Sequence, residues 1–371
     1  MYPKNFLNFF LLVYIFSIQF ETWDVLGSNF LISKITFVLY LFSKILFLKQ
    51  SKIFETVIQF KSYLLLIFSL LFLVIISGYI FSPVDFFSTI SFMNFSFFLL
   101  ILSDFYRDSD NIYKIFNIYK YASLIIIFFL IFGLFTENYV SETRIRVIGQ
   151  NENDLSLSFS FLIVYSLLNI KNRYRNFYYN IAIMILSFYA ILLLGSRSAF
   201  VAVVASFFII LSPKKLNLKY FIISFIYFSI AGIAFYFLLM NSNLGARFFT
   251  DNFDSGRFQY WAAVYDSSIP IYGIGFNGYR DLVYNQFASL DYFSAHNEFL
   301  QWYIYGGFLG LLILSYFFYK VLKLSLKNRI TFSFFPIVLV AFLFNQALGI
   351  KVVWLIMAFI LYHNKFVYAK T

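Results

Sequence analysis

The sequence contains no cysteine and only two histidines, His296 and His363. The absence of cysteine excludes disulfides, thiol nucleophiles and cysteine-ligated metals, and two histidines are too few for a multi-histidine metal site. Charged residues are scarce as well, because they form 12% of the 371 residues, about half the share of an ordinary globular protein. A water-soluble surface needs more charge than this. Soluble enzymes, secreted disulfide scaffolds and DNA-binding domains are therefore excluded, and no nucleic-acid partner is expected.

Apolar residues take the place of the missing charge. The hydrophobic set makes up 61% of the chain and aromatic residues 24%, and the mean hydropathy is +0.80. Apolar runs of 16 to 22 residues recur along the chain, each long enough to cross roughly 30 Å of hydrocarbon. We therefore expect an all-α polytopic membrane protein. The twelve predicted spans lie near residues 5–20, 28–48, 62–82, 84–103, 118–135, 154–170, 176–195, 198–212, 218–240, 298–319, 330–348 and 350–368.

Lysine and arginine between these spans predict the orientation, since basic residues concentrate on the cytoplasmic side of a membrane protein. They cluster in every second connection and in the C-terminal tail. The residues are Lys49, Lys52, Lys61, Arg107, Lys114, Lys120, Lys171, Arg173, Arg175, Lys214, Lys215, Lys219, Lys320, Lys323, Lys327, Arg329, Lys365 and Lys370. This pattern predicts twelve spans with both termini in the cytoplasm.

No linker or repeat divides the chain, so residues 1–371 are predicted to form a single transmembrane domain. Within it, residues 241–297 form one large outer, periplasmic loop, which is long enough to contain short helices, for example around residues 256–268. The centre of the loop, "PIYGIGFNGYR", is rich in turn-forming residues and is therefore predicted to be irregular.

The two basic residue types are distributed differently. Of eighteen lysines, only Lys351 lies clearly outside, whereas six of ten arginines are predicted to do so. Arginine presents a planar fork of donors that binds phosphate or carboxylate oxygens in pairs. Arginine on the side where cations are disfavoured therefore suggests an anionic ligand at the outer leaflet, such as a lipid pyrophosphate, with loop ion pairs as the alternative. The six residues are Arg144, Arg146, Arg197, Arg247, Arg257 and Arg280.

Two of the polar residues on the outer side carry the strongest expectations. Arg197 lies in "LLLGSRSAF" between two apolar runs with almost no loop, and an ionisable residue at such a depth is a functional candidate. His296 lies in "FSAHNEFLQ" at the entrance of the tenth span. Histidine is the side chain best suited to take a proton near neutral pH. The alternative for His296 is a helix cap or an interfacial residue.

Four motifs on the predicted outer side follow one another in order. "RIRVIGQNEN" carries Arg146, Gly149 and Asn153, and "GSRSAF" carries Arg197. "SGRFQYW" carries Arg257 and Trp261. "GIGFNGY…SAHNEFLQ…GGFLG" contains paired glycines and the dipeptide His296-Asn297. Together they resemble the O-antigen polymerase and O-antigen ligase superfamily of bacterial membrane glycosyltransferases (Wzy and WaaL). One departure is that Asn151-Glu152-Asn153 stands where the family has Asn-Pro-Asn.

The resemblance implies a GT-C-like, metal-independent and cofactor-free inverting transferase in the bacterial inner membrane, with its active site facing the exterior. Its donor is a glycan on undecaprenyl pyrophosphate, and a chain-length regulator is a candidate partner. In the family, arginines hold the pyrophosphate and the histidine deprotonates the acceptor. We therefore expect Arg197, Arg257, Arg146 and Arg144 on the pyrophosphate and His296 as the base. Further substrate contacts are expected from Arg247, Arg280, Asn153, Asn297, Trp261 and Tyr272.

Three functions remain open. A polymerase transfers a growing chain onto a lipid-linked repeat unit and is favoured, whereas a ligase transfers the same donor to lipid A–core. A lipid-linked oligosaccharide flippase belongs to another class. It should line a central cavity within the spans with its cations, whereas here the predicted cations gather in outer loops and one surface turn.

Overall fold

The structure is a computed structural model. It describes residues 3–20, 32–81, 86–134, 136–138, 145–147, 151–171, 176–212, 261–262, 264–265, 267–275, 296–345 and 347–367. The predicted span at residues 218–240 and most of the predicted loop at residues 241–297 lie outside the described residues. So do four of the predicted site residues, Arg144, Arg247, Arg257 and Arg280.

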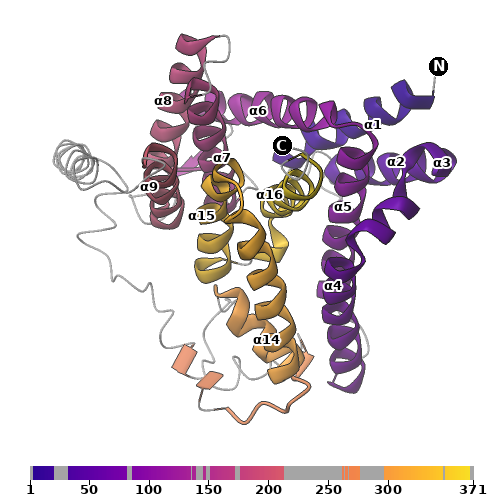
Figure 1. The fold of residues 1–371 in the computed structure, drawn as a ribbon. Coiled ribbons are helices and arrows are strands. Elements are labelled where there is room, and N and C mark those ends of the chain that lie inside the picture. The colour runs from indigo at the N-terminus through magenta and orange to yellow at the C-terminus, as the bar shows by residue number, and fades with distance from the viewer. Residues whose placement is uncertain are drawn as a thin grey trace.

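The described part of the chain is almost entirely helical (Figure 1). In order, the helices are α1 (Pro3–Ser17), η1 (Ile18–Phe20), α2 (Ile32–Leu46), α3 (Leu48–Ser51), α4 (Ile53–Phe81), α5 (Phe86–Arg107), α6 (Asp110–Ile131), α7 (Glu152–Lys171), α8 (Phe177–Leu194), α9 (Arg197–Leu211), α14 (Glu298–Ser325), α15 (Arg329–Phe344), η2 (Ala347–Gly349), α16 (Lys351–Tyr362) and η3 (His363–Val367). Eleven of the twelve predicted spans coincide with these helices.

Among the helices that the structure describes, five are long and apolar enough to cross a membrane, namely α6, α7, α8, α14 and the Ile53–Ser77 part of α4. A polytopic membrane protein is consistent with this finding. The count of twelve spans and the cytoplasmic position of the termini stay predictions. Most helices also begin or end beyond the predicted spans. α6 begins at Asp110 rather than near residue 118, because helical hydrogen bonds continue into segments too polar for the hydrocarbon.

One element departs from the all-α prediction. Residues Thr136–Asn138 form β1 and Ile145–Val147 form β2, and the two strands pair antiparallel. Arg146 lies in β2 opposite Glu137 of β1. Hydropathy assigned this segment only to an outer connection, because a ladder of three residues per strand leaves no apolar periodicity to read.

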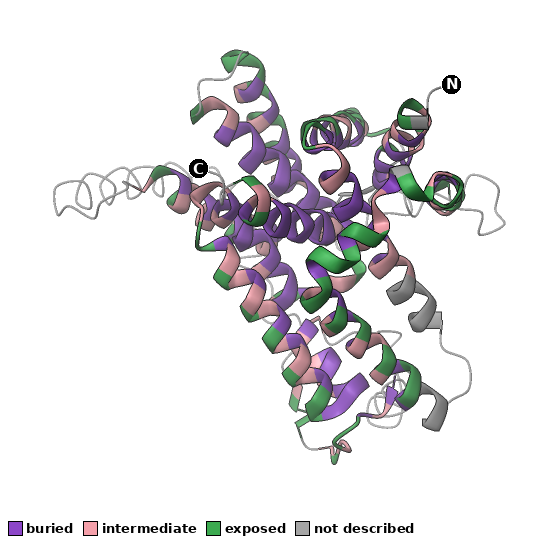
Figure 2. Cartoon of the chain, turned by 45° about the vertical axis from the view of Figure 1, so that its right-hand side comes forward, coloured by how far each residue is buried: buried purple, intermediate pink, exposed green. Residues whose placement is uncertain are grey.

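Burial identifies the centre of the assembly. All twelve residues of α16 are buried, as expected for a helix that is apolar on every face and surrounded by protein. In Figure 1, α14, α15 and α16 lie between α1–α5 on the right and α7–α9 on the left. Exposed residues line the outer sides of the helices (Figure 2). On α4 the exposed residues include six large apolar ones, which suit contact with lipid: Phe54, Ile58, Leu65, Phe68, Phe72 and Ile75.

Cationic side chains fix the last turn of α9. The guanidinium of Arg329 donates to the carbonyl of Ile209 at 2.8 Å, to that of Ile210 at 2.6 Å and to that of Ser212. Lys171, at the end of α7, donates to the same Ile210 carbonyl. Cations satisfy the carbonyls left unpaired at a helix C-terminus and interact favourably with its dipole. These contacts bring the end of α7, the end of α9 and the start of α15 to one end of the assembly, which we call the basic end.

The same end gathers two further helix termini. Near the end of α16, Asn364 Nδ2 donates to Thr331 Oγ1 at 3.0 Å, and Lys365 Nζ donates to the carbonyl of Gln59 near the start of α4. The helices therefore alternate in direction, as successive spans must. Assignment of the basic end to the cytoplasm rests on the lysine and arginine distribution.

A buried ion cluster joins α2 to the end of α5. Asp104 Oδ1 lies 2.9 Å from Lys44 Nζ and 2.9 Å from the guanidinium of Arg107, and both Asp104 and Lys44 are fully buried. Tyr40 donates its hydroxyl to Asp104 Oδ2, and Lys44 also donates to Ser103 Oγ at 2.9 Å. A single carboxylate therefore compensates two cations in the protein interior.

We predict that Asp104→Asn destabilises the protein by about 3 to 5 kcal/mol, because it leaves the charges of Lys44 and Arg107 buried without their counterion. Thermal unfolding of the detergent-purified protein measures the effect. Glu55→Gln is the matched control. It breaks the Lys52–Glu55 pair, whose side chains are 41% and 48% exposed, and it should change stability by less than about 1 kcal/mol. Equal stability of the two variants would contradict the structural role of Asp104.

Candidate functional site

The first turn of α7 is hydrogen-bonded to the turn between α8 and α9. Ser196 Oγ donates to Asn153 Oδ1 at 3.2 Å. Gly195 ends α8 in the left-handed conformation, with φ 63°, and Ser196 is the N-cap residue of α9. Two sequence motifs that are more than forty residues apart, "NEN" and "GSRS", are thus in direct contact.

Arg197 is the first residue of α9 and is half-buried. The N-terminus of a helix carries a partial positive charge and exposes backbone N–H groups. A guanidinium at this position adds a full charge and a planar fork of donors. The arrangement suits an anion, and phosphate oxygens match both the fork and the N–H groups.

A second contact joins the predicted irregular loop to α14 through hydrogen bonds between the two backbones. The N–H of Ile274 donates to the carbonyl of Ile304 at 2.9 Å, and the N–H of Leu309 donates to that of Ile271 at 3.3 Å. The loop segment and α14 cross at two glycines, and both have positive φ, 84° at Gly273 and 63° at Gly307. Within the segment predicted to be irregular, residues 270–274 are irregular or in a turn, whereas Gly275 is helical.

Only glycine fits at these two positions, because a side chain would clash with the neighbouring backbone and because the φ angles are positive. A Cβ on Gly273 would lie 2.3 Å from the carbonyl oxygen of Tyr305, and one on Gly307 would lie 2.2 Å from that of Ile271. α14 is interrupted at Gly307, where ψ is −158°. The carbonyl of Tyr305 accepts from Ser77 Oγ of α4 at 2.7 Å. The paired glycines therefore fix the first two turns of α14 against α4 and the loop.

At the start of α14, the neighbouring residues His296 and Asn297 have different structural roles. Asn297 is the N-cap residue, and its side-chain oxygen accepts from the N–H of Leu300 at 3.0 Å. His296 precedes the cap, is half-buried and has φ 47°. The cap is thus Asn297, and the alternative interpretation of His296 as the cap is wrong. A non-glycine residue in the left-handed region costs on the order of 1 kcal/mol, and such residues cluster at functional sites.

Glu298 was not predicted from the sequence. It is 2% exposed, and its carboxylate accepts from Trp302 Nε1 at 2.7 Å and from the N–H of Leu348 at 3.2 Å. The bond to Leu348 joins the start of α14 to η2, immediately before α16. A sequence signal existed, since an acidic side chain directly before a long apolar run must find buried donors, but its partner lies fifty residues away.

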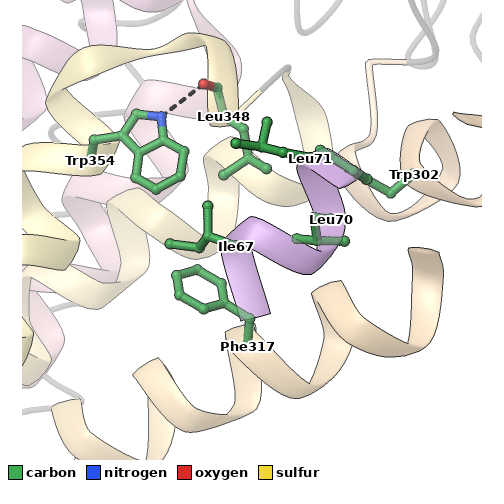
Figure 3. A pocket seen from close by; sticks show the side chains of 7 residues that line it. All are labelled: Ile67, Leu70, Leu71, Trp302, Phe317, Leu348 and Trp354. Atoms are coloured by element: carbon green, nitrogen blue, oxygen red, sulfur yellow. Dashed lines mark hydrogen bonds between the residues drawn. The ribbon is translucent and has the colours of Figure 1, made fainter. Parts of the chain in front are cut away.

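The carbonyl of Leu348 is satisfied in turn. It accepts from Trp354 Nε1 at 2.8 Å and from Asn94 Nδ2 of α5 at 2.9 Å. Figure 3 shows Leu348 and Trp354 beside a small apolar cavity of about 10 Å³, roughly the space of one water, which α4 and α14 also line. α5, α14 and α16 therefore meet at Leu348, at the end of the assembly opposite the basic end.

The remaining predicted site residues fall in different places. Arg146 lies in β2. Trp261 is half-buried in a helical segment, and Tyr272 is 40% exposed in the turn directly before Gly273. Of the predicted contacts, the structure brings Asn153 to the turn of Arg197 and places His296 at the start of α14, beside the cap at Asn297.

The comparison with known protein families bears on this region. Residues 182–315 match the family model of the O-antigen ligases. The resemblance predicted from the motifs is therefore confirmed over this segment, which contains Arg197, His296 and the paired glycines. The match supports a membrane glycosyltransferase of the O-antigen ligase and polymerase type, acting on lipid-linked glycans. No curated protein sequence matches the chain.

We predict that Gly307→Ala destabilises the protein by about 2 to 4 kcal/mol, because the new methyl group overlaps the carbonyl of Ile271 and strains a positive φ. Gly306→Ala is the control one residue away. Its Cβ would meet only the Leu73 side chain at 3.7 Å, and stability should change by less than about 0.5 kcal/mol. Thermal unfolding in detergent distinguishes the two. A Gly307→Ala protein as stable as Gly306→Ala would disprove the proposed crossing.

Proposed function

We propose that the protein is an O-antigen or surface-polysaccharide polymerase. It transfers a glycan from undecaprenyl pyrophosphate onto a second lipid-linked repeat unit at the outer face of the inner membrane. The observation that carries the proposal is the position of Arg197. It begins a helix, in a turn held by Asn153, within the segment that matches the O-antigen ligase family.

The proposed reaction is a direct displacement. A hydroxyl oxygen of the acceptor sugar attacks the anomeric carbon of the donor and forms the new glycosidic bond. The bond from that carbon to the pyrophosphate oxygen breaks, the configuration inverts, and the lipid pyrophosphate leaves with the bonding electrons. The hydroxyl proton passes to the imidazole of His296, which releases it to solvent afterwards. The step is balanced without an oxidant or reductant.

Charge development determines the role of the arginines. The departing pyrophosphate gains negative charge in the transition state, so fixed guanidinium donors lower the barrier by stabilising that charge as it forms. We assign this role to Arg197 and Arg257, assisted by Arg146 and Arg144. Arg247, Arg280, Asn153, Asn297, Trp261 and Tyr272 are proposed as further substrate contacts. For Asn297 the contact would come from its amide N–H groups, because its oxygen caps α14.

A ligase is the second candidate, and the description of the matching family favours it. Polymerase and ligase share the donor and the displacement chemistry, and they differ in the acceptor. Deletion of the gene in the source organism, followed by gel analysis of lipopolysaccharide, separates them. A core that carries a single repeat unit indicates a lost polymerase. A bare core with chains retained on the lipid carrier indicates a lost ligase, and unchanged surface polysaccharide would refute both.

We predict that Arg197→Lys lowers polymer formation about a hundredfold when the variant complements the deletion. Loss of one well-placed donor commonly costs on the order of 3 kcal/mol of transition-state stabilisation, and lysine keeps the charge without the fork. Ser206→Ala, a polar change further along α9 at a hydroxyl that donates to the carbonyl of Ala202 in the same helix, is the control and should retain activity. Normal polymer length with Arg197→Lys, at equal protein levels, would count against the pyrophosphate role.

We predict that His296→Asn abolishes turnover but leaves donor binding and stability nearly unchanged. Asparagine tolerates the left-handed conformation of this position, so the substitution removes the imidazole and little else. Asn297→Ala should show the converse pattern of lower stability, by about 1 kcal/mol, with residual turnover. Single-turnover transfer and binding of the lipid-linked donor measure the two effects. A normal rate for His296→Asn would eliminate the general base.

A further inference from the structure

A polar cavity of about 70 Å³ lies on the other side of the first turn of α7. One buried water needs roughly 10 to 15 Å³, so the cavity has room for several waters or for one compact polar group. Four elements line it: η1, the middle of α6, the start of α7 and the junction of η2 with α16. The residues that the argument uses are Gln19, Tyr119, Asn151, Asp154, Ser158 and Lys351.

The residues that line the cavity range from exposed to buried. Asn151 and Gly349 are exposed, whereas Tyr119 and Lys351 are buried, at 1% and 5% exposed. Tyr119 donates its hydroxyl to Ser158 Oγ at 2.7 Å, which fixes the wall formed by α6 and α7. A buried lysine is costly for a membrane protein, and such residues face cavities or functional pathways.

The chemistry of the lining is mixed. It provides one carboxylate, Asp154, and one ammonium, Lys351, together with the amides of Gln19 and Asn151 and the Ser158 hydroxyl. A phosphate would meet the acidic side chain of Asp154, and a free cation would meet the basic side chain of Lys351. One acidic and one basic group together suit a neutral ligand whose groups both donate and accept hydrogen bonds. Sugar hydroxyls do both.

The first turn of α7 connects the cavity to the turn that contains Arg197. Asn151, Asp154, Leu155 and Ser158 recur at the spacing of one helical face and line the cavity. Asn153 lies between them in sequence and bonds Ser196 in the turn that precedes Arg197. The first turn of α7 therefore separates a site suited to an anion from a site suited to hydroxyl groups.

We propose that this cavity binds a sugar ring of the glycan, with Asp154 accepting from its hydroxyls and Lys351 donating to them. The proposal rests on the function proposed above and adds a location and residues for recognition of the sugar. Asp154 and Lys351 are binding residues here, distinct from the arginines that hold the pyrophosphate.

Binding of two separate probes tests the proposal. The first is the repeat-unit oligosaccharide, released from the source organism's surface polysaccharide and free of lipid and phosphate. The second is inorganic pyrophosphate. Each is titrated calorimetrically into the full-length protein in detergent. The wild-type protein should bind both, and the two should bind independently.

Asp154→Asn and Lys351→Met should each weaken oligosaccharide binding about tenfold or more, since hydrogen bonds to charged groups are the strong ones. Both variants should leave pyrophosphate affinity within about twofold, whereas Arg197→Lys should do the reverse. Lys120→Met is the control. Lys120 is a lysine on α6 that is equally buried, at 6% exposed, and lies outside the cavity lining. Retained pyrophosphate binding also shows that a variant is folded.

Three results would overturn the proposal: oligosaccharide that does not bind the wild-type protein, oligosaccharide binding unchanged in both variants, and pyrophosphate binding lost in a Lys351→Met protein whose thermal unfolding matches that of the wild type. The last would make the cavity an anion site. Failure here is distinguishable from failure of the proposed function. If the deletion removes polymer while the cavity variants bind oligosaccharide normally, the glycosyltransferase stands and only the sugar site is wrong.

Discussion

The contact between the backbone at Gly273 and the backbone at Gly307 determines how the region around α14 is built. Because no side chain separates the two segments, the loop approaches α14 closely enough for N–H and carbonyl groups to pair across the crossing. The interruption of α14 at Gly307 then directs its first two turns towards α4 and η2, where Ser77 and Leu348 bond them. The position of His296 follows, since it directly precedes the first of these turns.

The first turn of α7 positions the turn that contains Arg197, as the paired glycines position the start of α14. Asn153 faces the turn of Arg197, and Asp154 faces the polar cavity beside Lys351. Lys351 begins α16 two residues after η2, whose Leu348 bonds Glu298. Hydrogen bonds and short segments connect these residues, so Arg197, the polar cavity and His296 lie at one end of the assembly. A lipid-linked glycan has the same order of groups, with a pyrophosphate next to a sugar.

The sequence predicted most helices but few of their contacts. Apolar runs located eleven described helices because hydropathy responds to the same transfer energy that places a helix in hydrocarbon. It placed the start of α6 too late, since Asp110 and Lys114 are polar yet continue the helix. The motifs identified Asn153, Arg197 and His296 as candidates. They did not identify Glu298 as a link between α14 and η2, because that role depends on Leu348, which only tertiary structure brings near.

Arg329 and Arg197 lie in different settings, and the planar guanidinium group explains why arginine suits each of them. At the basic end, the planar guanidinium of Arg329 spans the last turn of α9 and donates to three of its carbonyls. Arg197 lies in a different setting. The end of α8 beside it is capped by the N–H of Gly195, which bonds the carbonyls of Ile191 and Leu192 at 3.1 and 3.2 Å. Arg197 is the first residue of α9, so its guanidinium belongs to a helix N-terminus, where backbone N–H groups are also exposed. A guanidinium and backbone N–H groups at one helix N-terminus suit an anion with several oxygens, and pyrophosphate is such an anion.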